Sequence, residues 1–187
     1  MAASGIFDFI VRQSPKRYIL NHGDLKSWHL KLFADVVPIH YYAGNYRGPS
    51  KAHPCLNTDV AVGPNRGAPA SQVESEMRKF SEDLEAHIRA TDEFIDRSRS
   101  PKDRLKAAVQ LAAFVGGSII KIHPFLNGNG RIARFAMNFI LHRYLDKTPF
   151  FIHRPPHADY EGASEIAMIE GNFIPLYQYL LTIMATS

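Results

Sequence analysis

A stretch of twelve residues with the sequence HPFLNGNGRIAR contains the residue types that bind phosphate. Within it, Gly128, Asn129 and Gly130 favour a turn whose successive N–H groups point to one side and form an anion-binding nest. A helix pattern starts directly afterwards, and a helix N-terminus itself favours an anion. Arg131 and Arg134 fall in the predicted first turn, where cations oppose the helix dipole. A bound polyphosphate would explain this unfavourable placement.

His123 opens the same stretch and adds a group that can move a proton. An imidazole acts as a general base near neutral pH, so the chemistry indicated is attack of a hydroxyl on a bound polyphosphate. Each feature alone has an ordinary explanation, because lone histidines are usually structural and Asn-Gly pairs usually form turns. Their order within twelve residues favours the functional interpretation.

The elements that must position this stretch have helical spacing. The pattern predicts a helix over 25–36 with Asp24 as its N-cap. A second helix is predicted over 71–91, beginning with a capping box at Ser71. A third, over 101–122, is apolar on almost every face, which is typical of a buried central helix.

Three further helices are predicted: one directly after the loop, and two near 157–170 and 173–184. One short run, TDVAVG at 58–63, alternates as a strand does. The sequence therefore predicts an all-α fold with a small β-hairpin flap at about 45–66, in a single compact domain over 1–187.

Length, charge and cysteine content narrow the class of protein. The chain has 187 residues, enough for one domain with a buried core. Its net charge of +4 is dispersed, so nucleic acid is an unlikely partner. A single cysteine excludes an internal disulfide and fits a reducing, cytoplasmic location. The longest apolar run, 107–120, is too short for a membrane span.

The stretch His123–Arg134 resembles the signature of the Fic family, H-x-F-x-[DE]-G-N-G-R-x-x-R, at seven of its fixed positions. The resemblance is strong over 119–141 and looser over 24–184. It implies a mainly helical Fic fold. It also implies an enzyme that moves AMP from ATP to a Ser, Thr or Tyr hydroxyl of a target protein, which is called AMPylation. A related alternative is transfer of another phosphate-containing group.

The resemblance assigns a role to each matching residue. His123 would be the general base, and Phe125 would anchor the loop in the core. Tyr160 would line the adenine pocket, although a simple packing role is equally open. The phosphate-binding residues would be Gly128, Asn129, Gly130, Arg131 and Arg134, with Arg131 also serving catalysis and Arg134 holding the terminal phosphate.

Asn127 departs from the signature, which has Asp or Glu at this position for Mg²⁺. An amide oxygen is a hard ligand without charge, so it would bind Mg²⁺ weakly. Three readings stay open: an enzyme with weak Mg²⁺ binding, an enzyme with another donor or metal such as Mn²⁺, or a nucleotide-binding regulator without turnover. The presence of His123 argues against the last.

The segments GNYRG and TDVAVG look like the family's flap, which binds the target protein. An extended target segment could add to the edge of this strand by main-chain hydrogen bonds. No complete copy of the family's inhibitory motif, [ST]-x-x-x-E-[GN], occurs in the chain. Inhibition would then come from a separate antitoxin-like protein, or be absent. The residues predicted to contact the target are Thr58, Asp59, Val60, Ala61 and Val62.

Overall fold

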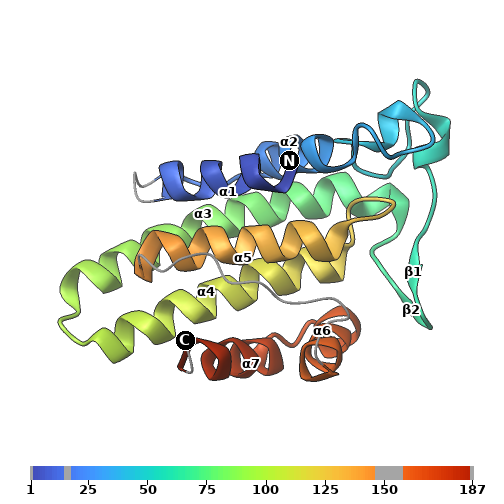
Figure 1. The fold of residues 1–187 in the computed structure, drawn as a ribbon. Helices are drawn as coiled ribbons and strands as arrows, with labels where there is room; N and C mark the ends of the chain where they lie inside the picture. Colours follow the sequence, from blue (N-terminus) through green and yellow to red (C-terminus); the bar gives the residue numbers. More distant parts are fainter. Residues whose placement is uncertain (1, 15–17, 146–157, 186–187) are drawn as a thin grey trace.

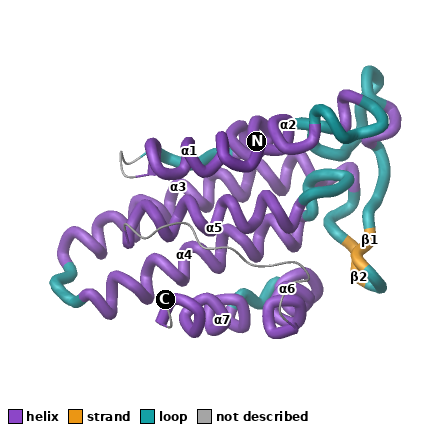
Figure 2. The backbone as a smooth tube through the Cα atoms, viewed as in Figure 1, coloured by secondary structure: helices purple, strands orange, loops and turns teal. Residues whose placement is uncertain are grey.

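Two antiparallel helices, α4 (Pro101–Ile122) and α5 (Asn129–Leu145), form the centre of the molecule (Figure 1). This computed structural model describes residues 2–14, 18–145 and 158–185. The other helices surround the central pair, and one short hairpin projects at one end (Figure 2). The remaining helices are α1 (Ala2–Gln13), α2 (His22–Phe33), α3 (Val73–Arg97), α6 (Ala158–Glu170) and α7 (Ile174–Ala185), and the strands are β1 (Ala61–Val62) and β2 (Asn65–Arg66). The predicted all-α fold with a small hairpin is therefore confirmed.

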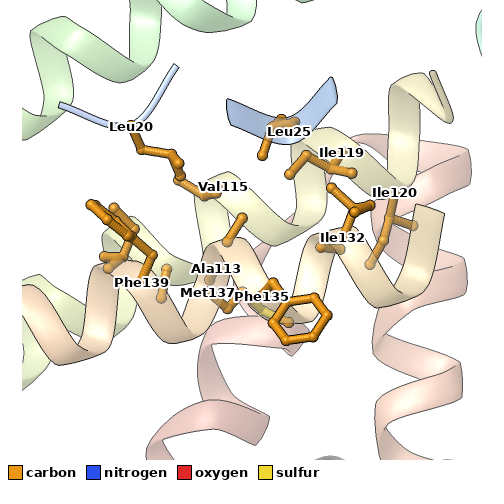
Figure 3. Close-up of a cluster of buried hydrophobic side chains, with 14 of the residues drawn as sticks. Leu20, Leu25, Ala113, Val115, Ile119, Ile120, Ile132, Phe135, Met137 and Phe139 are labelled. Atoms are coloured by element: carbon orange, nitrogen blue, oxygen red, sulfur yellow. The ribbon is translucent and has the colours of Figure 1, made fainter. Parts of the chain in front are cut away.

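The α4–α5 interface is the densest part of the core (Figure 3). Full burial of one such aliphatic or aromatic side chain contributes about 1.5–3 kcal/mol. Two glycines of α4, Gly116 and Gly117, let neighbouring side chains approach its backbone, those of Met137 and Phe173. Fully or nearly fully buried residues of this interface include Ala113, Val115, Ile119, Ile132, Met137 and Phe139.

Within the described part of the chain, α4 is the one helix with the length and hydropathy that a membrane span requires. Its 22 residues extend beyond the apolar run 107–120 predicted from the sequence. However, 67% of the apolar window is buried inside the domain, against α3, α5, α6 and α7. Its hydrophobicity is therefore that of a core helix.

Two predicted helix starts are wrong. Helix α2 begins at His22 and is capped by Asn21, whose side chain accepts the N–H groups of Gly23 and Asp24. Asp24 is instead the acidic member of this capping box, since its carboxylate accepts the N–H of Asn21 at 2.9 Å. Helix α3 follows a 3-10 turn at 70–72, and no side-chain cap is present at its N-cap, Gln72.

Helix α1 was not predicted. Its Ile6 and Ile10 are fully buried, four residues apart on one face. Phe7 packs edge-on against Phe135 of α5, with ring centroids 5.0 Å apart. Helix α1 thus covers α5 on the side opposite to α4 (Figure 1).

The β-element is smaller than the predicted strand over 58–63. Strand β1 pairs antiparallel with β2, Ala61 opposite Arg66 and Val62 opposite Asn65. One further bond, from Gly67 N to Val60 O at 3.2 Å, continues the pairing toward the domain. Thr58, Asp59 and Val60 lie outside the strand. The hairpin contacts α6, where the Asn65 side chain donates to Glu165 Oε1 at 3.0 Å.

The glycines of α4 provide a test of the core. A Cβ atom at Gly117 would collide with the ring of Phe173, so Gly117→Ala is expected to destabilise the domain by about 1–3 kcal/mol in urea unfolding. The matched control is Gly162→Ala in α6, where no atom lies within 4 Å of the new methyl group. This control is expected to gain about 0.5–1 kcal/mol from helix propensity. Equal effects at both positions would contradict the packing described.

Candidate active site

The signature loop, 123–128, connects α4 to α5 at the end of the molecule where the hairpin lies (Figure 1). The backbone of Ala68, just beyond β2, donates to Ile122 O at 3.1 Å. The N–H of Arg47 donates to Pro124 O at 2.8 Å. The structure therefore brings the predicted flap and the predicted signature loop together, although they are far apart in sequence.

His123 caps the C-terminus of α4 in the left-handed conformation, with φ 53°. It is the only non-glycine residue with positive φ in the described segments. Such backbone is costly for a residue with a side chain and persists only when its surroundings hold it. The N–H of His123 donates to Ile119 O at 2.9 Å, as expected for a helix end.

The His123 ring has a defined proton arrangement. Its Nδ1 lies 3.2 Å from the carbonyl oxygen of Ile120, which can only accept, so Nδ1 carries the proton. The Nε2 atom of the neutral ring is then left as a proton acceptor. Burial lowers the pKa of His123, and the nearby charge of Arg47 lowers it further. Both effects keep the ring neutral near pH 7, the state a base requires.

Phe125 and Asn129 fix the shape of the loop from the inside. The Phe125 ring is fully buried and stacks on His29 at 3.9 Å between ring centroids. The Asn129 side chain accepts the N–H of Phe125 at 2.9 Å and donates to its carbonyl at 2.8 Å. Phe125 is thus buried in the hydrophobic core. Asn129 differs from a simple cradle residue, because its side-chain amide is used by the loop and only its main-chain N–H stays available.

The predicted nest occupies the turn into α5. Gly128 has φ 79°, and its carbonyl accepts the N–H groups of Arg131 and Ile132. A Cβ at Gly128 would collide with the Phe33 ring, so glycine is required there for space as well as for backbone conformation. The first N–H groups of a helix have no partner within it. At α5 these are the N–H groups of Asn129 and Gly130, the pair predicted to bind an anion, which we call the anion-binding edge.

The two signature arginines differ in setting. Arg131 is exposed, and its guanidinium lies over the Phe33 ring, 5.3 Å from the centroid. The sequence analysis placed Arg134 in the first turn of α5, which is wrong. It lies in the second turn, and its side chain is partly buried. Arg131 is thus free to move toward a ligand, whereas Arg134 is more restrained.

Tyr160 of α6 is 4% exposed, and its ring packs on Tyr179 at 5.5 Å between centroids. The ring is therefore part of the contact between α6 and α7. Burial raises the pKa of Tyr160, while the charge of Arg134 opposes this effect. The Tyr160 hydroxyl and the nearby Ser164 hydroxyl are buried without a well-formed hydrogen bond to any described residue. Tyr160 thus lies beside Arg134, and its predicted contact with adenine stays a prediction.

Asn127 is exposed, and its Oδ1 accepts the N–H of Gly128 at 2.7 Å. Its amide oxygen is thus already used by the nest. Among the residues that the structure describes, no group of three or more His, Cys, Asp or Glu side chains is placed to hold a metal ion. The residues at this site do not fit a tightly held Mg²⁺, whose usual protein ligands are carboxylates.

The sequence analysis did not identify His29 as a residue of the site. It is 2% exposed, its Nε2–H donates to Asn127 O at 3.0 Å, and its Nδ1 accepts the N–H of Gly44 at 3.0 Å. It thus joins α2 to the signature loop and to Gly44, the first residue of the segment GNYRG. The available signal was its position one residue after Trp28 and four before Phe33, on the apolar face of α2.

Arg47 was also missed, although it lies within the predicted flap segment GNYRG. It is 1% exposed, and its guanidinium donates to the carbonyls of Ile122, His123 and Ala68. A sequence pattern gives no sign that an arginine is buried, because this depends on segments about 75 residues apart. Asp59, predicted as a target contact, lies 3.9 Å from Arg47 Nη1 and accepts the N–H of Ala70 at 2.7 Å.

A cavity of about 820 Å³ lies elsewhere, between α3, α4 and α7. A smaller one of about 410 Å³ lies between the hairpin, α3 and α4. Neither is lined by any residue of the stretch His123–Arg134. The two cavities therefore do not coincide with the predicted catalytic and phosphate-binding residues.

Comparison with known proteins agrees with this geometry. The model of the Fic/DOC family matches residues 19–141, which include α2, the hairpin, the signature loop and most of α5. The chain therefore belongs to the Fic/DOC family.

Two solved structures have a similar fold. One is a Fic-domain-containing signaling protein from Bacteroides thetaiotaomicron, with 21% identity and a TM-score of 0.68 over 96% of this chain. This chain spans 65% of that protein's length. The other is BepC, a VirB-translocated effector from Bartonella tribocorum, with 18% identity and a TM-score of 0.59. That match covers 95% of this chain and 79% of BepC, and the BepC structure contains AMPPNP.

His29 provides a pH test of the site's framework. Burial lowers the pKa of His29 to about 4, and a second ring proton would face the N–H of Gly44. Between pH 6.5 and 4 the unfolded chain binds this proton and the folded chain does not, so stability falls as the pH falls. The expected loss is about 3 kcal/mol across this range.

The measurement is urea unfolding at a series of pH values for wild type and His29→Gln. The variant is expected to be less stable at pH 7 and to lose less stability on acidification. Phe33→Leu is the control, since it weakens the same packing without removing a titratable group. A His29→Gln slope equal to that of wild type would contradict the assignment.

Proposed function

We propose that this protein is a protein adenylyltransferase, which moves AMP from ATP to a Ser, Thr or Tyr hydroxyl of a target protein. The observation that carries the proposal is the arrangement of His123. Its Nδ1–H is held by Ile120 O, and its Nε2 is an unprotonated acceptor a few residues from the anion-binding edge of α5. A base next to a phosphate site is the arrangement required for attack by a hydroxyl.

In the proposed reaction the target hydroxyl gives its proton to His123 Nε2, and its oxygen forms a bond to the α-phosphorus of ATP. The bond from that phosphorus to the β-phosphate oxygen breaks, and pyrophosphate leaves. The protein mainly positions the reactants and stabilises charge, as in other phosphoryl transfers. Because the pKa of His123 is lowered, activity is expected to be retained on the acidic side of the usual histidine range.

The phosphates would be held by main chain and arginines. The N–H groups of Asn129 and Gly130 would bind oxygens at the α5 N-terminus, where the helix dipole also favours an anion. Arg131, exposed above Phe33, would move to the leaving phosphates, and Arg134 would bind the terminal one. BepC has a similar fold and binds AMPPNP, an analogue of ATP, which supports a nucleoside triphosphate as the ligand.

The target would bind along the hairpin. Strand β1 has one partner strand, and Val62 at its edge is 48% exposed. An extended target segment would add to this edge through main-chain hydrogen bonds, with little demand on its sequence. The proposal includes a cytoplasmic location, which the single cysteine supports, and an antitoxin-like inhibitor as a separate protein.

Asn127 supports a second candidate within the same site. Its neutral amide oxygen is bonded to Gly128 N, and a weakly held Mg²⁺ or Mn²⁺ would slow transfer of AMP. Two functions then compete with adenylyl transfer: transfer of another phosphate-containing group, and nucleotide binding without turnover. The metal, when bound, would neutralise charge on the phosphates.

The test of the base is intact-protein mass spectrometry after incubation with ATP and Mg²⁺. Wild type is expected to gain the mass of AMP on itself or on added peptides with hydroxyl side chains. His123→Ala is expected to lose at least 10²-fold in rate, the scale of a missing general base. His87→Ala, which removes an exposed histidine of α3, is the matched control and is expected to keep the wild-type rate.

Other outcomes of this experiment favour a rival. A gained phosphate mass would indicate a kinase-like transferase. Binding of ATP without any gain in mass, also with Mn²⁺, would favour the nucleotide-binding regulator. Equal rates for wild type and His123→Ala would show that His123 is not the base.

The role of Asn127 is tested by Asn127→Asp. A carboxylate at this position adds the charge that Mg²⁺ prefers, so half-maximal activity is expected at an Mg²⁺ concentration about 10-fold lower. Asn127→Ala is the control, because it removes the bond to Gly128 N without adding charge. If Asn127→Asp and wild type need the same Mg²⁺ concentration, residue 127 is not a metal ligand here.

A further inference from the structure

Arg47 is the buried polar side chain with the largest number of links between the hairpin and the signature loop. Its Nε–H donates to His123 O at 2.7 Å, and Nη2 donates to Ile122 O at 3.0 Å and also to Ala68 O. Its own main-chain N–H donates to Pro124 O at 2.8 Å. One residue thus contacts three consecutive carbonyls at the start of the signature loop and one carbonyl just after β2.

The hairpin side of this contact is tightly packed. A Cβ at Gly67 would lie 2.6 Å from His123 Cβ and 2.8 Å from Arg47 Nη2, so no side chain fits between them. The N–H of Gly67 bonds to Val60 O, which makes this glycine part of the hairpin's hydrogen-bond ladder. A displacement of the hairpin would therefore be transmitted directly to Arg47 and to the backbone of His123.

One nitrogen of the Arg47 guanidinium has no hydrogen-bond acceptor among the described residues. Its Nη1 is buried without a hydrogen bond, and the nearest carboxylate oxygen, Asp59 Oδ1, lies 3.9 Å away. That oxygen bonds instead to the N–H of Ala70 at 2.7 Å, and the Asp59 side chain is 59% exposed. A small movement at the base of the hairpin would let Asp59 reach Nη1 and change how Arg47 sits.

We propose that Arg47 is a positioning residue that makes the placement of His123 depend on the hairpin, so that a target strand bound at β1 orders the catalytic base. The inference rests on the proposed function, since it names how the target-binding element acts on the base. His123 is held in left-handed backbone, the kind of conformation that requires support from its surroundings. Arg47 Nε supplies that support on the carbonyl side of the residue.

The test uses Arg47→Lys and Arg47→Met, with Arg97→Met as the matched control. Arg97 is an exposed arginine in the last turn of α3, outside the hairpin and the signature loop. Lysine keeps the charge but cannot reach three carbonyls at fixed geometry, and methionine removes both. If the enzyme transfers AMP, both Arg47 variants are expected to lose at least 10-fold in kcat with little change in KM for ATP, and Arg97→Met is expected to lose less than 2-fold.

A second readout does not depend on turnover: NMR titration of the His123 ring in histidine-labelled protein, assigned by its absence in His123→Gln. The midpoint is expected to rise in Arg47→Met, since Arg47 is the charged group that lowers the pKa of His123, and to stay unchanged in Arg47→Lys. Hydrogen exchange is expected to become faster at 66–70 and 120–125 together in both Arg47 variants. If Arg47→Met does not fold, Arg47→Lys decides through its kcat and its exchange pattern.

Three results would overturn the inference: an unchanged His123 midpoint in folded Arg47→Met, exchange that changes on the hairpin alone, or loss of stability in Arg47→Lys with unchanged kcat. A wild-type protein that transfers no AMP would refute the proposed function. In that case the NMR titration and the exchange pattern still decide whether Arg47 couples the hairpin to His123.

Discussion

The site depends on the contact between the buried guanidinium of Arg47 and the carbonyls at the C-terminus of α4. The last carbonyls of any α-helix lack partners within it, and at the C-terminus of α4 two of them accept from Arg47. A cation at this end is also favoured by the helix dipole. Hydrogen bonds that involve a charged group contribute about 1.5–3 kcal/mol each. These hydrogen bonds offset the cost of burying the Arg47 guanidinium. The carboxylate of Asp59, at 3.9 Å from Nη1, compensates only part of that cost.

The remaining contacts of the signature loop share one feature: buried side chains hold the loop from the core side. Phe125 and the amide of Asn129 fix the loop against the core, and His29 binds the carbonyl of Asn127 from beneath. The backbone at the start of α5 is thereby held in a fixed geometry. The phosphate site that we propose here would therefore lose little entropy when a ligand binds.

This design explains which features the sequence could predict. The signature stretch is local, so its residue types and spacing predicted the turn and the helix that follows, and they indicated His123 as the candidate base. The buried helix α4 was predicted with its observed bounds, because its apolar pattern is continuous. Asn129 was interpreted only as a nest residue, since no spacing rule indicates which way an amide side chain points.

The features that sequence analysis missed depend on contacts between distant segments. Arg47 and His29 are polar residues whose burial results from packing against the signature loop, 76 and 98 residues away. The helix caps were wrong at Asp24 and Ser71 because several adjacent polar residues can cap, and packing chooses among them. The hairpin is shorter than its alternating pattern, since Asp59 is used for a bond to Ala70 rather than for pairing.

We propose that the nucleotide binds at the signature loop and the start of α5, and not in the larger cavity between α3, α4 and α7. Titration of ¹⁵N-labelled protein with a non-hydrolysable ATP analogue, followed by amide chemical shifts, tests it most directly. We expect the largest shifts at Gly128, Asn129, Gly130 and Arg131, with small shifts elsewhere in α4 and α5. Largest shifts at Phe94, Phe114 and Ile174, which line the cavity, would contradict it.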